Sequence, residues 1–146
     1  MPQISKASQV ASLANDIVSV KDFGAVGDGV TDDTAAIQAA IDFAQTTVEA
    51  TFGINTPTVM FEAKTYSISS TITKKSASWV GAGVDQTVLK WDGDSSTVAV
   101  EQETVTARGG NSATTIEKMS FYEGSSKPLI WLSVPTNAAG YGVDFG

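Results

Sequence analysis

The chain has 146 residues and a mass of 15.2 kDa, which is the size of one domain. It contains no Cys and no His, so disulfides, thiolate chemistry, imidazole bases and the commonest zinc ligands are excluded together. Sixteen acidic against nine basic residues give a net charge of −7, which opposes binding to nucleic acid or to an anionic membrane surface.

The first 16 residues are polar and rich in Ser and Ala, with weak helical spacing at Val10, Leu13 and Ile17. They contain no unbroken apolar stretch followed by small residues, so we expect no secretory signal here. No run in the chain approaches the roughly 18 apolar residues that indicate a membrane span. We therefore predict a leader arm or connector over residues 1–16.

A strand, a turn and a helix are predicted next along the chain. Residues 17–23 alternate apolar and polar side chains, which predicts a short strand. Residues 24–33 contain three Gly and three Asp, a composition typical of a dense turn, and end in the N-cap candidates Thr31, Asp32 and Asp33. Over residues 33–45 the helical spacing predicts about three turns of amphipathic helix, with this buried face: Ile37, Ala40, Ile41 and Ala44.

From about residue 57 the pattern changes to short runs rich in Val, Ile, Thr and aromatic residues, separated by polar turns. Such runs predict β-strands, and the alternation of apolar residues within several of them predicts one inward face. The predicted strands cover residues 58–61, 65–73, 78–83, 87–91, 96–105, 114–122 and 128–134.

Many short strands without intervening helices fit either an antiparallel sandwich or a parallel β-solenoid. A sandwich favours tight hairpin turns, but the chain has no Asn-Gly pair, and its Asp-Gly pairs at 28 and 92 are followed by further turn residues or a helix cap. A solenoid of similar coils favours a sequence repeat, and none is visible. The pattern by itself leaves both architectures open.

The glycine-rich and aspartate-rich segments do not match known ligand loops. Counting from Asp28, positions 3 and 12 of a calcium loop fall on Val30 and Ala39, where a ligand and a bidentate Glu are required. Residues 24–29 and 81–83 lack both GxGxxG and a following GK[ST], so we assign their glycines to tight turns rather than to phosphate binding. We predict no cofactor and no metal.

Carbohydrate cleavage needs a pair of carboxylates about 5–10 Å apart. Glu101 and Glu103 lie on one face of a predicted strand, with Cβ atoms roughly 7 Å apart. Outward Glu residues on a strand are usually only solvated, so we assign no catalytic role to these candidates: Asp85, Asp92 with Asp94, Glu101 with Glu103, and Arg108. The aromatic residues with the size to stack on sugar rings are assigned to core or subunit packing: Trp79, Trp91, Trp131, Tyr122 and Tyr141.

Residues 18–44, VSVKDFGAVGDGVTDDTAAIQAAIDFA, resemble the opening of the pectate-lyase-like superfamily, which includes many phage tailspikes. Weaker resemblances to its first three coils follow at 59–72, 78–91 and 114–124. One departure is Ala63-Lys64-Thr65, where the family often has Pro-Gly before the Tyr of the first coil. The residues that carry the motif are Asp22, Phe23, Gly24, Ala25, Gly27, Asp28, Gly29, Thr31, Asp32, Asp33, Thr34, Ala36, Ile37, Gln38, Ala40 and Ile41.

The resemblance implies a mainly β fold, a right-handed single-stranded parallel β-helix with an N-terminal capping α-helix. The cap would cover about residues 32–45, and the coils would start at about residue 57. The motif is then structural: its glycines permit unusual backbone angles, Asp28 bonds its own turn, and Ile37 and Ile41 contact the first coil. A solenoid needs both ends covered. Because residues 137–146 offer no closing element, we expect 17–146 to be the N-terminal portion of a longer domain.

The functional expectation also comes from the resemblance. It implies the N-terminal β-helix part of a phage tailspike or related receptor-binding virion protein that attaches to host-surface polysaccharide. Depolymerase activity, by elimination or hydrolysis, is expected in coils beyond this chain. The resemblance further implies a homotrimer that contacts other virion tail components. From the net charge we expect it to bind neither nucleic acid nor membrane. Two alternatives stay open: a fragment of an extracellular polysaccharide lyase or glycosidase of the same superfamily, and a structural folding module without a ligand.

Overall fold

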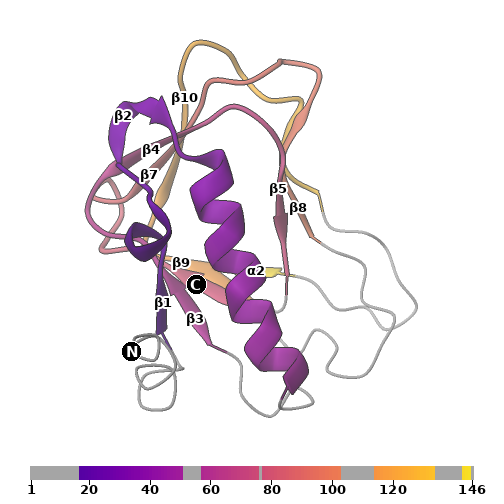
Figure 1. The fold of residues 1–146 in the computed structure, drawn as a ribbon. Coiled ribbons are helices and arrows are strands. Elements are labelled where there is room, and N and C mark those ends of the chain that lie inside the picture. The colour runs from indigo at the N-terminus through magenta and orange to yellow at the C-terminus, as the bar shows by residue number, and fades with distance from the viewer. Residues whose placement is uncertain (1–16, 51–56, 76, 103–113, 134–142, 146) are drawn as a thin grey trace.

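The computed structural model describes residues 17–50, 57–75, 77–102, 114–133 and 143–145 (Figure 1). Its strands form three sheets in which every pair is parallel. The first sheet has the order β1 (Ile17–Ser19), β3 (Thr58–Met60), β6 (Ser78–Val80), β9 (Thr114–Glu117) and β12 (Val143–Phe145). The second has the order β2 (Asp28–Asp32), β4 (Thr65–Ile68), β7 (Val88–Trp91) and β10 (Ser120–Glu123). The third contains β5 (Ile72–Lys74), β8 (Val98–Gln102) and β11 (Ile130–Ser133).

Successive strands along the chain belong to different sheets, and each sheet adds one strand per coil. The coils β3-β4-β5, β6-β7-β8 and β9-β10-β11 therefore stack one on another. This arrangement is a parallel β-helix, as predicted from the resemblance, and it excludes the antiparallel sandwich. None of the helices within the described residues is long and apolar enough to cross a membrane.

Helix α2 (Thr34–Ala50) follows β2, at the point of the first coil where later coils place a strand of the third sheet. It packs on β1, β3, β5 and the short 3₁₀ helix η1 (Val20–Phe23), and Figure 1 shows it lying across these strands. The predicted face of four apolar residues is fully buried: Ile37, Ala40, Ile41 and Ala44. The helix extends to Ala50, past the predicted end at residue 45.

Large side chains from successive coils fill the interior of the stack. Phe61 lies 5.5 Å from Tyr66 and 5.7 Å from Trp79, measured between ring centroids. Lys74 is fully buried as well, with its Nζ donating to the carbonyls of Ala77 at 2.7 Å and of Lys75 at 3.2 Å. Burial lowers the pKa of this ammonium group to about 7.

The structure corrects several predicted element boundaries. The strand predicted over 17–23 ends at Ser19, whose Oγ accepts a hydrogen bond from Lys21 N and starts η1. The dense turn predicted over 24–33 contains strand β2, because its residues 28–32 pair with β4. The run 65–73 divides into β4 and β5, and the run 114–122 divides into β9 and β10. Strand β12 was not predicted.

Candidate functional site

The glycines of the motif occupy backbone conformations that other residues avoid. Gly24, Gly27 and Gly29 have φ angles of 98°, 71° and 76°. At Gly27 a Cβ would also lie 2.8 Å from the Cβ of Lys64, so the turn excludes a side chain for a second reason. The residues 24–29 thus form a tight connection between η1 and β2.

The aspartates of the motif tie this connection together. Asp28 accepts hydrogen bonds from Val30 N at 2.9 Å and Thr31 N at 2.7 Å, which is the predicted bonding of its own turn. The Asp33 carbonyl accepts the first helical bond, from Ile37 N at 2.9 Å. Its buried carboxylate points backwards instead and accepts from Val26 N and Gly27 N.

Three further motif residues lie on the short helix η1 and on the capping helix α2. Phe23 contacts Phe43 of the helix at 5.5 Å between ring centroids, while the neighbouring Asp22 is exposed in η1. Gln38 lies on α2 beside the edge of β5, where its amide accepts from Thr73 N at 2.8 Å and donates to Thr73 O at 3.1 Å. The helix thereby satisfies backbone groups at an edge that would otherwise be open. The motif as a whole builds the covered N-terminal end.

Hydroxyl and carboxylate groups join neighbouring coils where the strands of the second sheet end. Ser69 Oγ donates to Asp32 at 2.5 Å, and Ser67 Oγ donates to Asp92 at 2.7 Å. Asp92 also accepts from the backbone N of Ser125 in the next coil at 2.7 Å. We call these residues the polar ladder: Asp32, Ser67, Ser69, Asp92 and Ser125.

The pKa values along the polar ladder reflect these bonds. Burial opposes ionisation of Asp92, but hydrogen bonds from Ser67, Ser125 and Lys90 outweigh it and lower the pKa to about 2. Burial also opposes ionisation of Asp32, and hydrogen bonds from Ser69 and Thr34 again leave its pKa below the usual value. Both carboxylates are therefore charged acceptors at neutral pH and unsuited to act as general acids.

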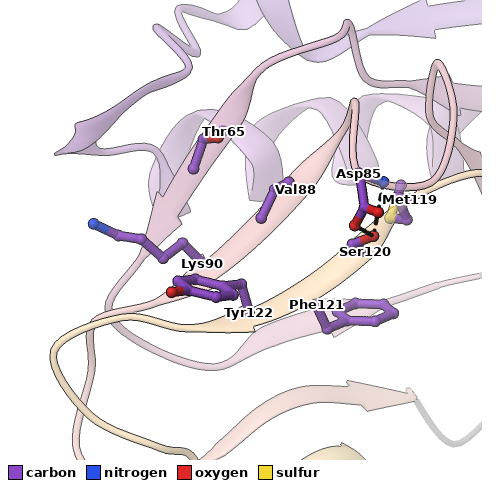
Figure 2. Close-up of a pocket in the computed structure, with 8 residues that line it drawn as sticks. All are labelled: Thr65, Asp85, Val88, Lys90, Met119, Ser120, Phe121 and Tyr122. Carbon is purple, nitrogen blue, oxygen red and sulfur yellow. Dashed lines mark hydrogen bonds between the residues drawn. The ribbon is translucent and has the colours of Figure 1, made fainter.

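A groove of about 590 Å³ runs over the outer surface of β4, β7 and β10 (Figure 2). The pairing of these strands aligns its lining in rows across the sheet, one of which holds Thr65, Val88 and Ser120. Tyr122 stands beside Lys90 in the next row. Tyr122 is 62% exposed, so its ring is available at the groove surface.

One end of the groove carries a carboxylate in a strained backbone position. Asp85 has a φ of 65°, which is uncommon for a residue with a side chain. Its N donates to Ser120 Oγ at 2.9 Å, and that hydroxyl donates to the Asp85 carboxylate at 3.0 Å. Lys118, just before β10, has a φ of 60°. Two uncommon backbone angles thus position Asp85 and Ser120 against each other.

Lys90 lines the groove with its side chain, and its ammonium group extends away from Tyr122 (Figure 2). Its Nζ donates to the Gly29 carbonyl at 2.6 Å and lies 3.0 Å from the Asp92 carboxylate. Gly29 lies in β2 and Asp92 directly follows β7, and three quarters of the Lys90 side chain is buried, since 25% of it is exposed. The charge of Lys90 is therefore already neutralised by the protein.

The other candidates that the structure describes do not gather into a second site. Asp94 is exposed and bonded within its own turn to Ser96, and Glu101 is exposed on β8. Among the described residues, no cluster of three or more acidic side chains is arranged to hold a metal ion. Glu103, Arg108 and Tyr141 lie outside the described residues.

The predicted aromatic candidates have different fates. Trp79 and Trp91 are fully buried in the core, as assigned. Trp131 is partly buried and contacts Phe121 at 5.3 Å between ring centroids. Tyr122, by contrast, is not in the core of this chain, because its side chain lies on the outer face of β10. Asp85 and Tyr122 were among the candidates from the sequence, but the groove that contains them was not predicted, because it requires the strand register.

The stacked coils, the covered N-terminal end and the outer groove define a parallel β-helix of the pectate-lyase-like kind. A model of the family described as "Rhamnogalacturonase A/epimerase, pectate lyase-like" matches residues 17–143. The chain belongs to this family, which confirms the superfamily inferred from residues 18–44.

Solved structures with the same fold come from a virus and from a bacterium. ORF18 of Geobacillus virus E2 is 33% identical with a TM-score of 0.60, over 77% of this chain and 22% of that protein. The A-module of the mannuronan C-5 epimerase AlgE4 from Azotobacter vinelandii is 26% identical with a TM-score of 0.61, over 89% of this chain and 37% of the module.

Curated relatives from Azotobacter vinelandii match about half of the chain. The mannuronan C5-epimerase AlgE5 is 46% identical over 88 residues, which are 52% of this chain and 8% of the epimerase. Alginate lyase 7 is 44% identical over 86 residues, which are 51% of this chain and 9% of the lyase. The matched region is therefore a small part of each relative.

Proposed function

We propose that this chain is the N-terminal part of the β-helix of a phage virion protein that attaches to polysaccharide on the host surface. The observation that carries the proposal is the similarity to the Geobacillus virus E2 protein, at 33% identity over 77% of this chain. The covered end built by α2 suits the first coils of such a domain, because a solenoid needs its terminal coil shielded.

The polysaccharide part of the proposal is supported by family membership and by the groove. The family description names a rhamnogalacturonase and an epimerase, and the bacterial relatives carry names that refer to mannuronan and alginate. The groove combines an exposed aromatic ring, Tyr122, with the polar pair Asp85 and Ser120. Apolar and polar groups placed together in this way are typical of ligand sites.

We expect catalysis by the whole protein, if it is a depolymerase, to use residues other than those described here. Asp92 and Asp94 have lowered pKa values, and each is already engaged in hydrogen bonds of its own coil or turn. Neither is therefore placed to give up and take back a proton on a substrate.

A second candidate function is the opening of an extracellular bacterial enzyme that modifies or cleaves polysaccharide. The observation in its favour is the 46% identity to AlgE5 over 88 residues, which exceeds the identity to the virus protein. The two candidates share a fold and differ in location, which is the virion for the first and outside the cell for the second.

The test uses the 146-residue chain, labelled with a fluorophore, on a panel of purified bacterial capsular polysaccharides and exopolysaccharides that includes alginate. The proposal predicts that some of them retain the chain, with no new reducing ends, no unsaturated uronate and no epimerised residues. Failure of every polysaccharide to retain it would refute attachment by this chain. Conversion of alginate would favour the bacterial enzyme instead.

The proposed assembly is a homotrimer, joined in the virion to other tail components. Light scattering coupled to gel filtration measures this directly, at several protein concentrations. A mass of about 15 kDa at the highest concentration would show that the chain does not form a trimer by itself.

A further inference from the structure

We propose that the groove over β4, β7 and β10 is a glycan-binding site that takes neutral polysaccharide in preference to polyuronates. The inference rests on the proposed function, since it names the site and the class of polysaccharide. It runs against the names of the bacterial relatives, which refer to the polyuronates mannuronan and alginate. Three features of the groove carry it: an exposed ring, a preorganised polar pair and, among the described residues of its lining, no positive charge that is free of a protein partner.

The exposed ring is that of Tyr122. In the parallel register it lies directly beside Lys90 of the neighbouring strand, so the aliphatic stem of the lysine flanks it. Figure 2 shows both side chains on the same side of the sheet, whereas Phe121 points away from them. An aromatic face with an apolar border is the surface on which the C–H groups of a sugar ring pack, and the phenol hydroxyl adds a polar contact.

The polar pair is Asp85 with Ser120. The carboxylate accepts from the Ser120 hydroxyl at 3.0 Å, which leaves further lone pairs of an ionised carboxylate for sugar hydroxyl donors. The φ of 65° at Asp85 costs conformational energy, and such strain is concentrated at sites where geometry is functional. Neutral sugars offer the hydroxyl donors that this acceptor requires.

The charges of the groove disfavour a polyanion. Lys90 is the cation of the described lining, and its ammonium already bonds the Gly29 carbonyl and the Asp92 carboxylate. At the other end the Asp85 carboxylate adds a negative charge that forms no ion pair with a cation among the described residues. The chain as a whole has a net charge of −7. The negative charges would therefore repel the carboxylate of a uronate, and no ion pair with the described lining would offset the free-energy cost of its desolvation.

The size of the groove suits a short stretch of a polymer. Ser120 and Tyr122 lie two residues apart on β10, which is roughly 6.6 Å along the strand and about the length of one sugar ring, while the three strands give the groove a width of about 10 Å. The volume of about 590 Å³ lies within the range of small-molecule sites. The glycan would run along the strands, with one ring on Tyr122 and the next near Asp85, because Asp85 is bonded to Ser120 of the same strand.

The test compares polymers that differ in charge and share a backbone: polygalacturonate with its fully methyl-esterified form, and carboxymethyl cellulose with hydroxyethyl cellulose. Dextran and mannan extend the neutral set. We expect the chain to bind neutral members and to bind the charged member of each pair at least tenfold more weakly at low salt. Raising NaCl from about 20 mM to about 500 mM should leave neutral binding unchanged.

Variants connect the binding to the groove. Tyr122→Ala should weaken neutral binding by about two- to tenfold, and Tyr122→Phe should retain most of it. Asp85→Asn should weaken binding of neutral polymers and reduce the preference for neutral over charged polymers. The fold should be kept, because Asn tolerates the left-handed backbone conformation of this position. Leu129→Ala is the matched control, because Leu129 is equally exposed, at 62%, and lies outside the groove lining.

The outcomes separate this inference from the proposed function. If the chain binds a polysaccharide but prefers the charged polymers, or if Tyr122→Ala binds like Leu129→Ala, the groove assignment is wrong and polysaccharide attachment stands. If neither the neutral polymers nor the bacterial polysaccharides retain the chain, both are wrong. Circular dichroism of each variant ensures that a loss of binding is not a loss of fold.

Discussion

Asp92 connects three coils through one carboxylate, which makes Asp92→Asn an informative change. The carboxylate accepts from Ser67 in the preceding coil at 2.7 Å and from Ser125 N in the following coil at 2.7 Å, and it lies 3.0 Å from Lys90 Nζ. Asparagine keeps the size and an acceptor oxygen, and it removes the charge. The change therefore tests how much of the stability depends on the ionised form.

The magnitude follows from the pKa. These hydrogen bonds lower the pKa of Asp92 from 3.8 to about 2, against the opposing effect of burial. At about 1.4 kcal/mol for each pH unit, the ionised group contributes about 2 kcal/mol to the free energy of unfolding at pH 7. Because the folded-state pKa is lowered, this stabilisation is complete above about pH 4 and falls to less than about 0.5 kcal/mol near pH 2.

Urea unfolding followed by circular dichroism, at pH 7, 5, 3 and 2, measures the difference between the wild type and Asp92→Asn. We expect the difference to be about 2 kcal/mol at pH 7 and to shrink towards zero at pH 2. Asp22→Asn is the control, since Asp22 is exposed in η1 and lies outside the polar ladder. A difference that stays constant with pH would refute the assignment, because it would come from shape and not from charge.

Three further changes test the packing of the stack. Gly93→Ala should cost about 1–3 kcal/mol in thermal unfolding, because a Cβ there would overlap a carbonyl and an indole ring, whereas Gly83→Ala, which meets only a flexible side chain, should be nearly neutral. Ile41→Asp should unfold or aggregate the chain, because it buries a charge under α2. An unchanged melting curve would refute the capping role. The control is Ala39→Asp, on the exposed face of the same helix. The third change is Lys74→Met. In the wild type the pKa of Lys74 is about 7 in the folded state and about 10.5 in the unfolded state, so between these pH values the folded protein loses the buried charge while the unfolded chain keeps its proton. The stability of the wild type relative to this variant should therefore rise over that range, and a flat difference in urea unfolding would contradict the buried charge.

The parts of the fold that depend on local order could be predicted from the sequence. The buried face of α2, with Ile37 and Ile41, follows from helical spacing alone. The choice of a β-helix over a sandwich did not follow from the pattern. The β-helix was predicted from the ordered motif of residues 18–44, because the coils of this fold share a structure without sharing a sequence repeat.

The groove could not be predicted, because its lining comes from different coils. Thr65, Val88 and Ser120 become neighbours only through the parallel register of three strands. The outward position of Tyr122 depends in addition on Lys118, whose φ of 60° divides one predicted strand into β9 and β10. Such a corner resets which of two alternating residues faces the core. Aromatic residues in a strand indicate packing, and only the structure distinguishes Phe121, which packs on the core, from the exposed Tyr122.

The polar ladder has a consequence for how such a domain accepts change. Its hydrogen bonds between coils connect residues that are 37, 25 and 33 positions apart, so the number of residues between bonded partners is not fixed. An insertion at an exposed corner, such as Asp94–Ser96, lengthens one coil and leaves its hydrogen bonds to the preceding and following coils in place. New loops can therefore be grafted coil by coil, and the outer surface can diversify in evolution while the stack stays in register.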